Sequence, residues 1–188
     1  MLRIITGEAK GKALKTLEGE ATRPTSERIK EAIFSSIQFD VENRRVLDLF
    51  AGCGQLGFES LSRGAASVTF IDAAREAMDV VKSNAKALGY FDRCKYLVSD
   101  YRNYIRKAAG TAEFDLVFID PPYAMECAKD ALERLVGAQM LAKGAIAVLE
   151  SGTEEIFPEN IPGFEIKKST RYGKKTFVNI LVYRGEAE

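Results

Sequence analysis

The chain contains 188 residues, three cysteines and no histidine, and 27 basic side chains balance 27 acidic ones. This length corresponds to about one domain with a sizeable core. Histidine is the usual general base near neutral pH and a frequent zinc ligand, so its absence excludes Ser-His-Asp catalysis, Cys-His catalysis and His-based zinc hydrolysis. Three scattered cysteines predict neither a disulfide framework nor a metal cluster. Chemistry that depends on positioning and hydrogen-bond acceptors remains possible.

The sequence does not predict membrane insertion or secretion. No apolar run approaches the roughly 18 residues of a spanning helix. Residues 1–7 lack the longer apolar stretch and the cleavage site of a secretory signal. We therefore expect a monomer in the reduced cytoplasm, without a membrane or metal partner.

The net charge of zero hides an uneven distribution. Residues 1–30 carry seven Lys or Arg and four Glu, and residues 167–184 carry six Lys or Arg and no acid. Residues 31–166 carry fourteen basic and twenty-one acidic side chains. A basic face would exist if the two ends of the chain met in space, although a solvated surface explains such clusters equally well.

Residues 1–24 are expected to form an N-terminal β-hairpin extension, with short strands at 2–6 and 12–15. A helix should follow, because Thr25 or Ser26 can serve as its N-cap. Its inward-facing residues would be Ile29, Ile33, Phe34 and Ile37.

Residues 25–188 alternate between short apolar segments and helix-like segments. The expected strands are 45–50, 67–72, 94–99, 115–119, 144–150, 164–170 and 176–183. The expected helices within this region are 55–63, 74–88, 101–108 and 125–140. Such alternation predicts a parallel sheet with helices on both faces, and the last two strands have room only for an antiparallel hairpin. The expected fold is a single Rossmann-like α/β domain with a mostly parallel, seven-stranded sheet.

A glycine turn follows the first strand of this core. Gly52, Gly54 and Gly57 give the spacing Gly-x-Gly-x-x-Gly at a strand-to-helix junction. Glycine lets the backbone bend tightly and lets a ligand approach without a Cβ clash, and the following helix points amide groups at the same place. The spacing also fits dinucleotide-binding enzymes and plain tight turns.

Three aspartates favour a nucleoside cofactor at this turn. Asp72 ends the second strand, eighteen residues after Gly54, where a carboxylate can accept both hydroxyls of a ribose. Asp100 ends the third strand and could accept the amino group of an adenine. Asp48 lies inside the first strand, where burial is costly without a partner, so it should order the turn or meet an ammonium group. Each aspartate could instead be a turn former or a helix cap.

An acidic, proline-rich segment follows the strand expected at 115–119. Asp120 and the carbonyl group of Pro121 can accept the hydrogens of an amine whose lone pair is delocalised into a base ring, which leaves the lone pair aimed at a methyl group. The prolines fix φ and remove amide donors, and Tyr123 can stack on an extruded base. Proximity and alignment would then supply much of the rate. A plain strand end is the structural alternative for the two prolines.

Together these segments resemble the bacterial 16S ribosomal RNA guanine-N2 methyltransferases, the small-subunit methyltransferase D family. The resemblance spans nearly the whole chain and is carried by Arg3–Gly7, Thr22–Phe34, Leu47–Ala65, Asp120–Tyr123 and Arg171–Gly173. It implies the class I fold of S-adenosylmethionine-dependent methyltransferases. It also implies methyl transfer from that cofactor to the exocyclic amine of a guanine in 16S ribosomal RNA or the small ribosomal subunit. The choice of guanine over adenine rests on the resemblance alone.

The predicted site residues fall into three groups. The catalytic candidates are Asp120, Pro121 and Tyr123. The cofactor candidates are Asp48, Phe50, Ala51, Gly52, Gly54, Asp72, Asp100 and Tyr101, together with Arg23 and Thr25, which the resemblance implies near the methionine end of the cofactor. The candidates for RNA contact are Arg3, Lys10, Lys12, Arg171, Tyr172, Lys174 and Lys175.

The chain departs from the family pattern at a few positions near the cofactor. Cys53 replaces the usual Ser or Thr, and Gln55 replaces Ala or Gly. Asp72 replaces Glu, and Ala73-Ala74 replaces a more polar pair. The shorter acid at position 72 can still reach a ribose after a small shift. None of these departures touches residues 120–123.

Other functions share parts of this pattern. DNA adenine-N6 methyltransferases also use Asp-Pro-Pro-Tyr, but they usually carry a separate target-recognition region, for which this chain has no space. Protein glutamine methyltransferases favour Asn at the position of Asp120. A non-catalytic RNA-binding protein of this fold would not need Asp120, Tyr123 and the glycine turn intact. A nicotinamide-dependent enzyme would have no use for residues 120–123.

Overall fold

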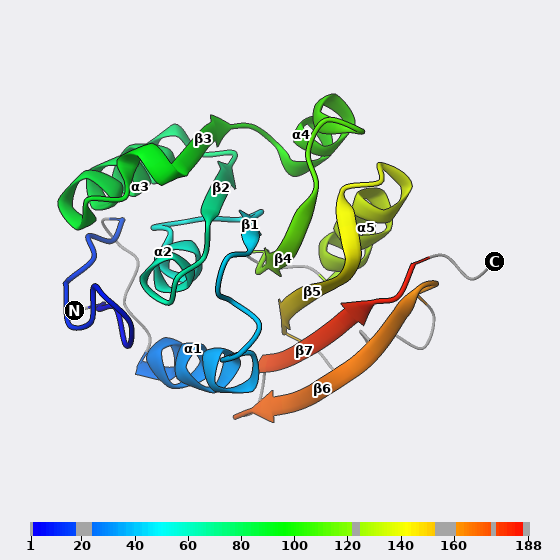
Figure 1. Ribbon diagram of the computed structural model, residues 1–188, viewed down its shortest axis with the longest axis horizontal. Coiled ribbons are helices and arrows are strands. Elements are labelled where there is room, and N and C mark those ends of the chain that lie inside the picture. The colour runs from blue at the N-terminus through cyan, green and yellow to red at the C-terminus, as the bar shows by residue number, and fades with distance from the viewer. Residues whose placement is uncertain (1, 18–23, 122–124, 153–160, 174–175, 186–188) are drawn as a thin grey trace.

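A seven-stranded sheet forms the centre of the molecule (Figure 1). The computed structural model describes residues 2–17, 24–121, 125–152, 161–173 and 176–185. The strands are β1 (Arg45–Asp48), β2 (Ser67–Asp72), β3 (Cys94–Val98), β4 (Phe114–Ile119), β5 (Leu141–Ser151), β6 (Phe164–Tyr172) and β7 (Thr176–Tyr183). Their order across the sheet is β3-β2-β1-β4-β5-β7-β6. The first five strands pair in parallel, and β7 runs antiparallel to both β5 and β6.

Helices cover both faces of this sheet (Figure 1). They are α1 (Pro24–Ser36), α2 (Gln55–Ser62), α3 (Arg75–Leu88), the 3-10 helix η1 (Phe91–Arg93), α4 (Tyr101–Ala108) and α5 (Met125–Gly137). Successive strand residues point to opposite faces. Phe118 accordingly packs on the face covered by α1, α2 and α3, whereas Val117 packs on the face of α4 and α5. Within the described residues, no helix is long and apolar enough to cross a bilayer.

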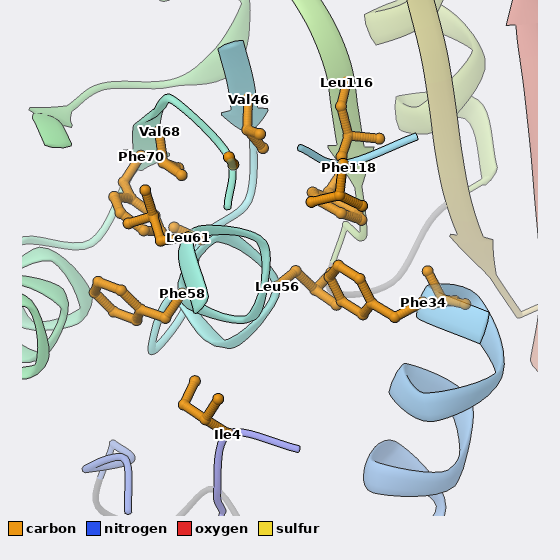
Figure 2. Close-up of a cluster of buried hydrophobic side chains, with 14 of the residues drawn as sticks. Ile4, Phe34, Val46, Leu56, Phe58, Leu61, Val68, Phe70, Leu116 and Phe118 are labelled. Atoms are coloured by element: carbon orange, nitrogen blue, oxygen red, sulfur yellow. The ribbon is translucent and has the colours of Figure 1, made fainter. Parts of the chain in front are cut away.

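The core beneath α1, α2 and α3 is rich in aromatic rings. The rings of Phe34 and Phe118 lie 5.7 Å apart, and those of Phe58 and Phe70 lie 4.8 Å apart. Figure 2 shows Leu56 of α2 and Phe34 of α1 pointing toward one another, with Ile4 of the N-terminal segment approaching α2 from another side. The N-terminal segment therefore contributes to the main core.

The expected fold class is confirmed, since the sheet is mostly parallel and ends in an antiparallel hairpin. Element bounds differ by a few residues, and β5 is longer than expected because it begins at Leu141. The predicted N-cap at Thr25 or Ser26 is wrong, because α1 already begins at Pro24, a residue whose missing N–H costs nothing at the first helical position. The residues predicted to face inward are buried: Ile29, Ile33 and Phe34 of α1, and Ile37 directly after it.

Residues 2–17, the described part of the N-terminal extension, form a turn-rich loop with little regular pairing. The expected strands at 2–6 and 12–15 reduce to a single antiparallel bridge between Arg3 and Ala13. Backbone hydrogen bonds from Ile4 to Lys12, from Gly11 to Ile4 and from Leu14 to Leu2 keep the hairpin shape. The segment packs on the main core instead of extending the sheet, because its apolar residues Leu2, Ile4, Ala9 and Leu14 are buried there.

A buried carboxylate fastens this extension to the helices. Glu59 of α2 is fully buried and accepts backbone hydrogen bonds from Ile5 at 2.8 Å and Thr6 at 3.0 Å. Arg63 donates to it at 2.9 Å, and the ammonium group of Lys30 in α1 lies 3.7 Å away. Lys30 is also buried and donates to the carbonyl group of Arg3 at 2.7 Å. Burial lowers the pKa of Lys30, and the charge of Glu59 opposes that shift.

Glu59→Gln should lower the free energy of unfolding by about 3–5 kcal/mol, because removing one partner leaves Lys30 buried without its countercharge. Urea denaturation at neutral pH would measure this loss. Glu8→Gln is the matched control, since the Glu8–Arg93 pair is exposed and should contribute at most about 1 kcal/mol. Equal losses for the two variants would contradict the structural role given to Glu59.

Candidate functional site

The strand order reverses between β1 and β4, and the candidate site lies at the carboxyl ends of these strands. β1 pairs with β2 on one side and with β4 on the other. Asp48 of β1 lies opposite both Phe70 and Phe118 in the register. In open α/β sheets, the crevice at such a reversal is the usual ligand site. The glycine turn and Asp120 follow these two neighbouring strands directly.

The glycines of the turn have different tasks. Gly52 and Gly54 adopt φ of 54° and 82°, which favours glycine at both positions. A Cβ at Gly52 would meet no atom within 4 Å, whereas one at Gly54 would lie 2.6 Å from the ring of Phe58. Gly57 packs still closer, since its Cβ would lie 2.3 Å from the ring of Phe70. Gly52 therefore borders open space suited to a ligand, and the other two allow α2 to pack on the sheet.

Asp48 anchors the beginning of α2. Its carboxylate is buried and accepts a hydrogen bond from the amide of Gly57 at 3.1 Å. The pKa of Asp48 is raised to about 7, mainly by burial and to a smaller extent by the negative charge of Asp72, whereas the hydrogen bond from Gly57 opposes the shift. The structure thus bears out the role of Asp48 in ordering the turn, and its contact with an ammonium group stays a prediction.

Asp72 joins the end of β2 to the glycine turn. Its Oδ2 accepts from the amide of Gly52 at 2.8 Å, and its Oδ1 accepts from the amide of Ala74 at 2.8 Å. The amide of Ala51 also donates to the carbonyl group of Ile71 at 2.9 Å. The carboxylate is therefore held beside the turn, where the predicted ribose contact would be made.

Asp100 caps α4 at the end of β3. Its Oδ1 accepts from the amides of Arg102 at 2.9 Å and Asn103 at 3.4 Å. The amide of the preceding Ser99 donates to the carbonyl group of Asp72 at 2.9 Å, so the ends of β2 and β3 are joined. The capping alternative is thus realised for Asp100, and adenine recognition stays a prediction.

Phe50 and Tyr101 form an aromatic contact between the glycine turn and α4, with ring centroids 5.3 Å apart. The hydroxyl group of Tyr101 donates to Asp130 of α5 at 2.6 Å, and Arg102 and Arg134 donate to the same oxygen at 3.0 and 2.8 Å. These donors hold the pKa of Asp130 well below its usual range, and burial together with Asp130 raises that of Tyr101. The sequence interpretation did not include Asp130, whose single carboxylate fixes the predicted cofactor residue Tyr101.

The catalytic segment begins where β4 ends. Asp120 and Pro121 are half-buried and follow Ile119, the last residue of β4. The amide of Leu49 donates to the carbonyl group of Phe118 at 3.1 Å, which holds the ends of β1 and β4 together. Two candidates, Tyr123 and Arg23, lie outside the described residues, and for Thr25 only its place in the first turn of α1 is described.

One buried polar atom at the turn fits a bound cofactor. Gln55, the first residue of α2, has a buried Oε1 without a hydrogen-bond partner in the described part of the chain. A buried, unsatisfied acceptor is costly. A ligand that carries amino or ammonium groups would supply the missing donor. The residues present therefore fit the cofactor that the sequence predicts.

The candidates for RNA contact lie on two segments that flank α1. Arg3, Lys10 and Lys12 are exposed on the N-terminal extension, and Arg3 donates to the carbonyl group of Gly11 at 2.8 Å. Arg171 is exposed at the end of β6, and Tyr172 beside it packs against the main core.

The two basic ends of the chain contact the same helix. Lys30 of α1 donates to the extension, and Lys168 of β6 donates to Ser36 of α1 at 2.8 Å. Lys174 and Lys175 lie outside the described residues. Among the residues that the structure describes, no group of three or more Cys, Asp or Glu side chains is arranged to hold a metal ion.

Comparison with known proteins identifies relatives along nearly the whole chain. The sequence model of the family described as Conserved hypothetical protein 95 matches residues 2–181. The putative rRNA methyltransferase YlbH of Bacillus subtilis is 36% identical over 92% of this chain and 94% of its own length. Ribosomal RNA small subunit methyltransferase D of Haemophilus influenzae is 32% identical over 85% of this chain and 84% of its own. The solved structure of the putative methyltransferase yhhF from Escherichia coli superposes with a TM-score of 0.89 and 26% identity, covering 98% of this chain and 99% of that one.

The raised pKa of Asp48 predicts a pH-dependent stability. The folded protein holds this proton more tightly than the unfolded chain between the ordinary value of 3.8 and about 7. The free energy of unfolding should therefore fall as pH rises through that window, by at most about 4 kcal/mol, and stay level above it. Asp48→Asn should remove this contribution. Urea unfolding at about pH 4.5 and about pH 7.5 would test it, because wild type should lose stability relative to the variant over that interval.

Asp115→Asn is the control for this test. Arg45 lowers the pKa of Asp115, so its contribution is present throughout this interval and is lost only at lower pH. The difference in the free energy of unfolding between wild type and Asp115→Asn should therefore be the same at both pH values. If the difference in the free energy of unfolding between wild type and Asp48→Asn were also the same at both pH values, the Asp48 carboxyl group would not have a raised pKa.

Proposed function

Because the chain belongs to the Conserved hypothetical protein 95 family, with relatives named ribosomal RNA small subunit methyltransferase D, we propose that it methylates the exocyclic N2 amine of a guanine in 16S ribosomal RNA. Its cofactor is S-adenosylmethionine. The observation that supports this most directly is the geometry of β1 and β4. These neighbouring strands end in the glycine turn and in Asp120-Pro121, a turn suited to a cofactor beside acceptors suited to an amine.

The chain's own groups would hold the target amine for attack. S-adenosylmethionine, when bound, supplies the methyl group of its sulfonium. Asp120 and the carbonyl group of Pro121 accept the two hydrogens of the amine, so that the nitrogen lone pair faces the methyl carbon. The carboxylate of Asp120, which accepts one of these hydrogens, would take up the proton that the amine nitrogen loses when it is methylated. Alignment of the two reactants is the main contribution expected of such a site.

The substrate would lie over α1, between the N-terminal extension and β6. Arg3, Lys10, Lys12 and Arg171 are exposed on these segments and would bind phosphates, which position an RNA without reading its sequence. Lys174 and Lys175, which follow Arg171 closely in the sequence, are proposed to bind phosphates as well. We assign the reaction to a monomer in the cytoplasm, acting on ribosomal RNA or on the small ribosomal subunit.

Asp120→Ala should abolish methyl transfer while leaving cofactor binding nearly intact. Loss of the acceptor that orients the amine should reduce the rate by about 10²-fold or more. The measurement is transfer of labelled methyl groups from S-adenosylmethionine to small ribosomal subunits that lack their native methylation, with the modified nucleoside identified. Wild type should give N2-methylguanosine.

Asp79→Ala, a change at an exposed aspartate of α3, is the matched control and should keep full activity. Duplex DNA is the second substrate in the same assay. Formation of N6-methyladenine on DNA would favour the DNA methyltransferase alternative. Cofactor binding without transfer to either substrate would contradict the proposed reaction.

The phosphate contacts should make the affinity for RNA depend on salt. The double variant Lys10→Ala, Lys12→Ala should bind substrate more weakly, and its plot of log affinity against log salt should be shallower by about one unit per lost contact. The control is Lys107→Ala, Lys129→Ala, which removes two lysines from α4 and α5 on the opposite face of the sheet. An unchanged slope in the first variant would remove the N-terminal extension from the RNA-binding surface.

A further inference from the structure

Asn84 of α3 links two parts of the chain that sequence analysis treats separately. The side chain is buried, with an exposed fraction of 2%. Its Oδ1 accepts from the backbone amide of Lys15 at 2.8 Å, and its Nδ2 donates to the backbone carbonyl of the same residue at 3.0 Å. The second hydrogen of Nδ2 is donated to the carbonyl group of Cys53 at 3.1 Å. One amide group thus bridges the N-terminal extension and the glycine turn.

The buried position of Asn84 indicates that these hydrogen bonds are its main structural role. It stands three residues after Val81 and four before Leu88, on the buried apolar stripe of the helix. An amide placed there is costly unless its donors and acceptor are used. These three hydrogen bonds are with backbone atoms, so they fix the course of the chain at Lys15 and at Cys53 whatever side chains stand there.

Both ends of the bridge matter to the proposed site. Cys53 lies between Gly52 and Gly54, the two turn residues with positive φ. Lys15 belongs to the extension, which α2 holds through Ser62. The hydroxyl group of Ser62 accepts from the amide of Ala9 at 3.0 Å and donates to the carbonyl group of Thr6 at 2.6 Å. The extension carries candidates for RNA contact, and the turn is the predicted cofactor site.

We propose that Asn84 is a positioning residue that makes the shape of the cofactor turn depend on the docked N-terminal extension. The inference rests on the proposed function only in taking this turn as the cofactor site. A substrate that binds the extension would then alter cofactor affinity through Asn84. By linkage, the factor by which docking of the extension raises cofactor affinity equals the factor by which cofactor binding favours docking of the extension.

A double-mutant cycle tests this link, with S-adenosylhomocysteine as the calorimetric probe of the turn. Asn84→Ala should weaken its binding about tenfold, because the Cys53 carbonyl loses its buried donor. Gly7→Ala should also weaken binding, through its effect on the contact between the extension and Ser62 of α2. A Cβ at residue 7 would lie 1.8 Å from the carbonyl oxygen of Ser62, so the extension must move off α2. In the Asn84→Ala background, Gly7→Ala should have little further effect.

Gly11→Ala is the control for this cycle. Gly11 has the same positive φ as Gly7, 82° against 88°, but its Cβ would meet no atom within 4 Å. It should therefore carry similar strain without displacing the extension, and leave the affinity unchanged. Additive effects of Gly7→Ala and Asn84→Ala would overturn the proposal, because the extension would then act through α2 alone. Wild type that failed to bind the probe would contradict the proposed function itself.

Hydrogen exchange of the wild-type protein gives a second test, which needs no variant to fold. Addition of S-adenosylhomocysteine should slow exchange of the Lys15 amide, which is bonded to Asn84 and remote from the turn in sequence. The amide of Gly110, in the loop after α4, is the reference and should not respond. An unchanged exchange rate at Lys15, with the probe bound, would overturn the link.

Discussion

The burial of one carboxylate, Glu59, determines how the rest of the site is assembled. A charge removed from water is costly unless hydrogen bonds and an opposite charge compensate it. Two backbone amides of the extension, Arg63 at the C-cap of α2 and Lys30 of α1 provide this compensation. If the extension, α1 or α2 moved away, the buried charges of the other segments would lose part of this compensation. The extension, α1 and α2 therefore fold as one unit, and α2 carries the glycine turn at its beginning.

The acids at the strand ends organise the backbone before any ligand is considered. Asp48, Asp72 and Asp100 accept hydrogen bonds from the amides of Gly57, Gly52 and Arg102, respectively. Turn formation and ligand binding are thus compatible roles, because each carboxylate has several lone pairs. Groups already held in place need little rearrangement when a reaction develops charge. This arrangement suits a chain that lacks histidine and must rely on alignment.

The fold class and the position of the glycine turn could be predicted because they depend on local patterns. The apolar runs at 67–72 and 176–183 match β2 and β7 residue for residue, and the glycine spacing marks the turn. Contacts between distant residues could not be predicted in this way. Glu59 is recognisable as important only when residues more than fifty positions away are seen to donate to it. Asp130 likewise depends on the approach of α5 to α4.

Some of the missed features did leave a signal in the sequence. Asn84 is a polar residue on the apolar stripe of α3, where only a specific set of partners makes it acceptable. The N-cap prediction at Thr25 or Ser26 was wrong because a sequence signal was given too much weight: good capping residues also occur inside a first turn. The preceding Pro24, which is favoured at the first helical position, was the better indication.

The neutral total charge of the chain is consistent with an RNA substrate because the basic residues are concentrated on particular segments. Basic residues gather on the extension and on β6, both of which contact α1, while the acids of β1 and β2 face the turn. Long-range attraction depends on the local field of a surface, and a balanced total does not cancel that field within a Debye length of about 8 Å. One small domain can therefore hold a cationic cofactor and an anionic polymer on adjoining surfaces.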